Sequence, residues 1–150
     1  MLTFNQFPMS PSANAIYKIV KNRKVSSKKL KDFEGRCQMW SFTNRNEIVA
    51  ARKIMRDEKK RNLFAFKYEF CFHFKSVFCI GKDNYGDPKK MDVSNRIKAA
   101  EDNICRLLAI DDKQIMKIQA EKIIIVDEMP EHINISIESY EYDRGKYGKK

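Results

Sequence analysis

The sequence predicts an α+β or mixed-sheet α/β fold, built as one small domain in which helices cover a mixed β-sheet. Two observations predict it: residues 63–75 alternate with a period of two, and residues 93–107 carry the apolar stripe of an amphipathic helix. At 150 residues, 43% of them hydrophobic, the chain is long enough for one domain with a real core and too short for two. We therefore expect a single domain at residues 1–142 and a flexible basic tail at 143–150.

The first half of the chain reads as a strand followed by a helical region. Leu2–Phe7 alternates weakly and predicts a first strand, which the prolines after it stop. Ser26 or Ser27 can cap the helical region that follows. Trp40 lies on its apolar stripe, so we interpret it as a core residue. Whether residues 44–46 divide the region into two helices stays open.

Leu63–Lys75 is the clearest strand signal, because aromatic side chains occupy every second position. Helices must cover that face, so we interpret it as core and not as a surface for stacking bases. The other face is mixed and includes His73, to which we assign no role. The aromatic face comprises Phe64, Phe66, Tyr68, Phe70, Phe72 and Phe74.

Two strands are expected after the central helix. Ile115–Val126 ends in a nearly continuous apolar run, and 133–137 alternates isoleucine with polar residues. A turn at Asp127–Glu131 separates them, which predicts that they pair as a hairpin.

The four cysteines form no Cys-x-x-Cys pair and lie in apolar or periodic segments. This pattern is typical of free thiols in a reducing compartment, and we expect a cytoplasmic protein. A structural zinc site at Cys71, His73 and Cys79 is disfavoured because the spacing is too wide.

A formal charge of +10 predicts a polyanionic partner, and the absence of a long apolar run argues against a membrane span. Lys18–Lys31 holds seven bases and no acid, which favours contact with nucleic-acid phosphates over a merely solvated loop. Tyr17 is placed to stack on a base or sugar. The candidate DNA-binding residues are Lys18, Lys21, Arg23, Lys24, Lys28, Lys29, Lys89, Lys90 and Arg96.

Residues 81–112 carry the candidate chemistry. Asp92 lies at or beside the start of the central helix, Lys98 follows about one and a half turns later, and Asp111 and Asp112 come just after the helix. If the chain turns back there, the three carboxylates can surround one ion. Carboxylates, a lysine and positive surroundings suit metal-assisted phosphodiester cleavage, since Mg²⁺ needs only one or two protein carboxylates.

The same stretch resembles the RusA-type Holliday junction resolvases. The matching residues are Lys89, Lys90, Asp92, Asn95, Lys98, Asp111 and Asp112, preceded near the N-terminus by the turn Pro11-Ser12-Ala13-Asn14. The resemblance covers most of the chain in order. Ser94 is the one departure, because the family usually has its second acid at that position.

This resemblance implies a Mg²⁺-dependent endonuclease, with Mn²⁺ as another usable ion, that resolves four-way DNA junctions by paired nicks. It implies a homodimer whose sheets associate across a two-fold axis. Asp92 and Asp112 would be metal ligands and Lys98 the electrostatic helper. Ser94 and Asp111 are further candidate ligands.

Three alternatives remain at this stage. The chain can be a basic nucleic-acid-binding protein of the same fold with weak or lost catalysis, with Ser94 as the lesion. It can be another metal nuclease that uses Asp111-x-Lys113 as an acid-x-lysine motif. Taken singly, Asp92 can be a helix cap and Lys98 one half of an exposed i,i+4 pair with Asp102.

Overall fold

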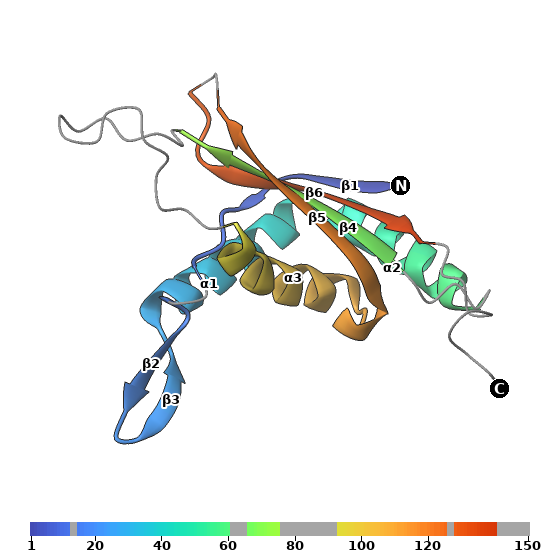
Figure 1. The fold of residues 1–150 in the computed structure, drawn as a ribbon. Helices are drawn as coiled ribbons and strands as arrows, with labels where there is room; N and C mark the ends of the chain where they lie inside the picture. The colour runs from blue at the N-terminus through green and yellow to red at the C-terminus, as the bar shows by residue number, and fades with distance from the viewer. Residues whose placement is uncertain (13–14, 61–65, 76–92, 126–127, 141–150) are drawn as a thin grey trace.

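The computed structural model describes residues 1–12, 15–60, 66–75, 93–125 and 128–140. These residues form one small α+β domain with a mixed four-stranded sheet and a separate two-stranded sheet, so the predicted fold class is confirmed (Figure 1). The elements are β1 (Leu2–Pro8), β2 (Tyr17–Val20), β3 (Arg23–Ser26), α1 (Lys28–Thr43), α2 (Arg45–Lys60), β4 (Phe66–Phe74), α3 (Ser94–Leu108), the 3₁₀ turn η2 (Asp112–Gln114), β5 (Ile115–Ile124) and β6 (His132–Ser139).

Strand β4 forms the centre of the core. Its five aromatic side chains from Phe66 to Phe74 are almost fully buried, while the residues between them are only partly buried. The aromatic face therefore packs against the helices, as predicted, and no described helix covers the other face, here called the open face (Figure 1). Phe64 lies outside the described residues.

The order of the main sheet is β1-β6-β4-β5, which corrects the predicted hairpin of the last two strands. β5 runs parallel to β4, whereas β6 runs antiparallel to β4 and β1. The helical connection through α3 allows the parallel pairing of β4 and β5. β6 then pairs on the opposite side of β4, so that three of its isoleucines share the buried face.

The helical region is divided into two helices near Asn44. Ser27 caps α1, accepting a hydrogen bond from the Leu30 N–H at 3.2 Å. The Asn44 backbone and side-chain N–H groups both bond the Trp40 carbonyl, at 3.0 and 2.9 Å, which ends α1. Trp40 is partly buried and packs edge-on against the core residue Phe7, with ring centroids 5.0 Å apart.

Cys37 and Cys105 are buried free thiols and Cys71 is a half-buried one, as expected for these three; Cys79 lies outside the described residues. Burial raises the pKa of Cys37 to about 12 and that of Cys105 to about 11. None of the described helices is long and apolar enough to cross a membrane.

Candidate functional site

The site forms where Lys98, on the second turn of α3, reaches the turn that follows the same helix. Ala109 ends α3 in the left-handed conformation, with φ 56° and ψ 42°. The Ile110 N–H then bonds the Cys105 carbonyl at 3.0 Å, which reverses the chain direction. This turn leads into η2, so Asp112 comes back beside Lys98.

Lys98 joins two carboxylates. Its Nζ lies 2.8 Å from Asp102 Oδ1 on the next turn of α3 and 3.3 Å from Asp112 Oδ2 in η2. The hydrogen bond to Asp102 and, after it, the one to Asp112 raise the pKa of Lys98, although partial burial opposes them. The ammonium is therefore charged at neutral pH. All three side chains are about half exposed.

Lys98 makes both of the contacts that its position in the sequence allowed. It does form the ordinary i,i+4 pair with Asp102, and it also reaches the acid doublet after the helix. Sequence reasoning treated Asp102 only as a pairing partner, yet its carboxylate shares one cation with Asp112. Glu101 lies close by, where burial, together with Asp112 and Asp102, raises its pKa against the opposing effect of Lys98.

Asp111 is held differently from Asp112. Its carboxylate caps η2 by accepting from the Lys113 N–H at 3.1 Å and pairs with Lys113 Nζ at 3.0 Å. These bonds to Lys113 lower the pKa of Asp111. The doublet is thus divided between two lysines, Asp112 with Lys98 and Asp111 with Lys113.

The remaining predicted residues of the site lie at or before the start of α3. Ser94 is the first residue of α3 and is exposed; the preceding N-cap position is Val93, which has no side-chain capping bond. Asp92, Lys89 and Lys90 lie outside the described residues. Their predicted roles stay predictions.

Arg96 makes hydrogen bonds within the protein that occupy part of its guanidinium. Its guanidinium donates to the Ser10 carbonyl at 2.6 Å, and Ser10 Oγ donates back to the Arg96 carbonyl at 2.7 Å. Burial lowers the pKa of Arg96. Arg96 also lines a cavity of about 540 Å³, whose other charged lining residues are Lys29, Arg36, Lys75, Asp32 and Glu131. The cavity thus carries more basic than acidic side chains and lies beside the proline-containing turn after β1.

The basic arm predicted at Lys18–Lys31 is the β2–β3 hairpin and the first turn of α1. Its bases are exposed, and Lys24 Nζ lies 4.3 Å from the Tyr17 ring centroid. The hairpin extends from the helical layer away from the main sheet (Figure 1). Sequence reasoning did not find the hairpin, although the apolar residues on either side of Lys21-Asn22 were the available signal.

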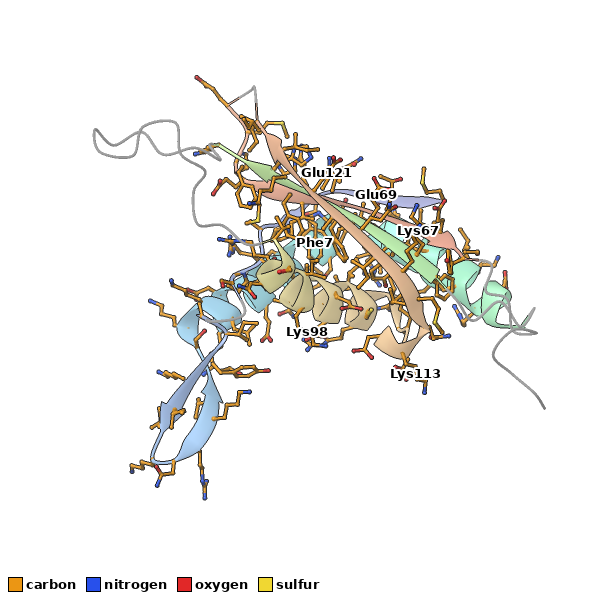
Figure 2. The ribbon with its side chains drawn as sticks, viewed as in Figure 1. Phe7, Lys67, Glu69, Lys98, Lys113 and Glu121 are labelled. Carbon is orange, nitrogen blue, oxygen red and sulfur yellow. The ribbon has the colours of Figure 1, made fainter. Side chains whose placement is uncertain are left out.

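A second group of ionisable side chains lies on the open face of the sheet, which sequence reasoning also missed. Ligand atoms of Glu69, Cys71 and Glu121 lie within 4.8 Å of one another. The Cys71 thiol donates to Glu121 Oε1 at 3.3 Å, and burial followed by this bond raises the pKa of Cys71 to about 11. Figure 2 shows Glu69 and Glu121 on the side of the sheet away from Lys98. Glu69 and Cys71 alternate along β4 and could have been placed on one face from sequence.

Comparison with known families decides which proteins this chain is related to. The family model for the endodeoxyribonuclease RusA matches residues 7–138 of the 150. The chain belongs to the RusA endodeoxyribonuclease family. No curated protein matches it significantly.

Membership in the RusA family assigns the chain to the DNA endonucleases that resolve Holliday junctions in recombination. The match spans β1 to β6 and therefore includes α3, the acid doublet and the hairpin. This RusA-family protein accordingly has DNA as its substrate, in line with its formal charge of +10.

Proposed function

We propose that this protein is a Mg²⁺-dependent endonuclease that resolves four-way DNA junctions by paired nicks and acts as a homodimer. The observation that carries the proposal is the contact of Lys98 with Asp112, which brings together two residues separated along the chain that the RusA resemblance assigns to one site. Phosphodiester cleavage needs such a combination of oxygen ligands and positive charge.

The donors around Lys98 fit Mg²⁺. Asp102 and Asp112 present carboxylate oxygens to solvent on the same side of α3, and an ammonium within 3.3 Å of both indicates locally negative surroundings. Mg²⁺ prefers hard oxygen ligands and keeps several waters. Asp112 and Asp92 would hold the ion, with Ser94 and Asp111 as further candidates; when bound, it supplies an activated water and charge neutralisation.

Lys98 provides the electrostatic part of the reaction. The ion pair of Lys98 with Asp102 is shorter than that with Asp112, so Asp102 is the partner that mainly holds the ammonium in place and keeps it charged. From there the charge offsets the negative charge that develops on the phosphate during cleavage. Mn²⁺ should also support activity, since it accepts the same oxygen donors.

Binding of the DNA relies on the basic residues of the helical layer. Lys18, Lys21, Arg23, Lys24 and Lys28 are exposed on or beside the hairpin, where they can neutralise phosphates and release counterions. Lys29 and Arg96 line the cavity beside the proline-containing turn after β1. Arg96 would then also keep the Ser10 turn in place while contributing charge.

A homodimer gives the two identical sites that paired nicks require. β5 is an edge strand of the main sheet, and Met116, Ile118 and Ile124 on it are 47%, 39% and 46% exposed. An exposed apolar edge strand readily pairs with another chain. We assign the dimer contact to β5, in agreement with the sheet association that the family resemblance implies.

Nicking of a synthetic four-way junction tests the whole proposal. The protein is incubated with strand-labelled junctions in Mg²⁺ or Mn²⁺, with linear duplex and chelator as controls. We expect nicks at symmetry-related positions on opposing strands and a dimer mass in sedimentation equilibrium. Junction binding without nicks at any metal concentration would support the alternative of a catalytically inactive binding protein.

A further inference from the structure

The β2–β3 hairpin has the geometry of a narrow projecting ribbon. Its two strands pair from Tyr17↔Ser26 to Val20↔Arg23, and the connecting residues Lys21 and Asn22 have φ values of 49° and 61°. Positive φ at both central residues produces the tight two-residue turn that matches strand twist. All four residues of β2 are exposed, so the ribbon packs on little of the domain (Figure 1).

The base of the ribbon is firmly attached to the domain. Ile16 is 6% exposed and belongs to the core. The Ser27 N–H donates to the Ile16 carbonyl at 2.7 Å, and Ser27 Oγ donates to the Ala15 carbonyl while capping α1. These contacts fix the direction in which the ribbon leaves the helical layer.

Apolar side chains occupy the tip of this ribbon without being buried. Ile19 is 79% exposed and Val20 is 43% exposed, one on each face next to the turn. Lys24 pairs with Ile19 and Arg23 pairs with Val20, so a cation stands beside each apolar side chain. Burial cannot explain why apolar side chains occupy the tip, because a two-stranded ribbon has no core of its own.

We propose that Ile19 and Val20 insert at the branch point of the DNA junction and contact its exposed base faces. Proteins that kink DNA insert apolar side chains between base steps and hold the flanking phosphates with basic side chains. Unstacking costs least where pairing and stacking are already interrupted, as at a crossover. The tip therefore confers preference for branched over linear DNA. The basic residues of the hairpin attract the phosphates of both kinds of DNA equally; they are Lys18, Lys21, Arg23 and Lys24.

The inference rests on the proposed DNA substrate and is tested by binding, without cleavage. The double variant Ile19→Ser/Val20→Ser is titrated with a four-way junction and a linear duplex of the same arm sequence, both in chelator. We expect junction affinity to fall about 10-fold and duplex affinity to stay unchanged. When 2-aminopurine is placed at the crossover, binding of the wild-type protein should increase its fluorescence. The double variant should not produce this increase.

Three controls separate the apolar contact from other effects. Lys18→Gln/Lys24→Gln should weaken both DNAs equally and flatten the salt dependence. Met39→Ser removes a side chain that is 68% exposed on α1 and should change neither affinity. Ile19→Leu/Val20→Leu should keep the junction preference, and thermal unfolding should match the wild type in all variants.

Equal loss on both DNAs, or no loss on the junction, would overturn the inference, as would a wild-type protein without preference for junctions. Failure of the proposed function looks different. In that case the wild-type protein prefers junctions and the tip variant loses this preference, but no metal produces nicks.

Discussion

The two sides of the main sheet each gather carboxylates around another ionisable group, with opposite electrostatic results. On the helical side, Asp102 and Asp112 share the permanent cation of Lys98. On the open side, Glu69 and Glu121 lie around the thiol of Cys71, which stays neutral at pH 7 because its pKa is about 11. Both groups offer carboxylates, but only the group at Lys98 offers a positive charge for a phosphate. Figure 2 shows Lys98 on the side of the sheet away from Glu69 and Glu121.

The residues around the two groups also differ in charge. The basic hairpin leaves the helical layer on the side away from the open face (Figure 1). DNA bound to it, as proposed, would approach the Lys98 side. The open face has partly buried residues of mixed charge, including a Lys67–Glu138 pair at 3.2 Å. A cluster of ligands is thus insufficient to mark a nuclease site; its position relative to cationic DNA-binding residues matters as much.

The first prediction separates the two sides by their acids. Asp112→Asn should reduce junction nicking by at least about 100-fold, because it removes an ionic oxygen ligand from the site. Binding should stay near wild type, since affinity comes mainly from Lys and Arg contacts to phosphate. Nicking rates and gel shifts on the same preparations measure both, and Asp92→Asn should behave alike.

Glu121→Gln is the matched control on the open side, with the same loss of one carboxylate from an exposed group. It should nick at the wild-type rate. If Glu121→Gln were inactive and Asp112→Asn active, the catalytic site would lie on the open face.

Much of this fold was predictable because its elements carry strong periodicity. The alternation in β4 and the stripe of α3 each specify one buried face, and Ser27 specifies the start of α1. Strand order was not predictable in the same way. A continuous apolar run such as that of β5 has no face preference, so hairpin and parallel pairing to β4 look alike in sequence.

The candidate site shows the same division between local and distant information. The pair of Lys98 and Asp102 follows from helical spacing alone. The contact of Lys98 with Asp112 depends on the left-handed turn at Ala109, a conformation that alanine rarely adopts and that sequence therefore does not announce. Glu121 joins Glu69 only through the register of β4 with β5.

The second prediction concerns the cation that distinguishes the helical side. Lys98→Met should lower the nicking rate about 10- to 100-fold, because one stabilising charge near the phosphate is lost while the carboxylates remain. Single-turnover nicking at saturating metal measures it. Lys113→Met is the matched control, as Lys113 pairs with the other acid of the doublet, Asp111, at 3.0 Å. Equal losses in both variants would indicate that only general positive charge matters.

The third prediction adds a carboxylate at Ser94, the position where the RusA resemblance implies an acid. Serine is a neutral and poorer ligand, so the wild-type protein should need more Mg²⁺ than a three-acid relative and work better with Mn²⁺. Ser94→Asp should lower the Mg²⁺ midpoint of nicking a few-fold, and Ser94→Ala should change it little. An unchanged or higher midpoint for Ser94→Asp would show that position 94 does not face the ion.

The last prediction concerns pH, to which only the open side should respond near neutrality. The raised pKa of Lys98 keeps the helical side charged throughout this range. On the open side, the His73 ring stacks on His132 with centroids 4.4 Å apart, and burial followed by the proximity of His132 lowers the pKa of His73. The unfolded chain therefore takes up a proton at His73 more readily than the folded protein does.

Stability must accordingly fall as the pH drops through the unfolded pKa of about 6.5 toward the folded one, because the unfolded state then binds more protons. His73→Gln removes this contribution, so its melting temperature should fall less between pH 7.5 and pH 5.5 than that of the wild type, by on the order of 1–2 °C. The comparison is clean because His132 is the one other histidine of the chain. Thermal unfolding of both proteins across this range measures the difference, and parallel curves would mean that the stacked pair folds with its ordinary proton affinity. Nicking rates should show no such difference between the two proteins, since His73 lies on the face opposite Lys98.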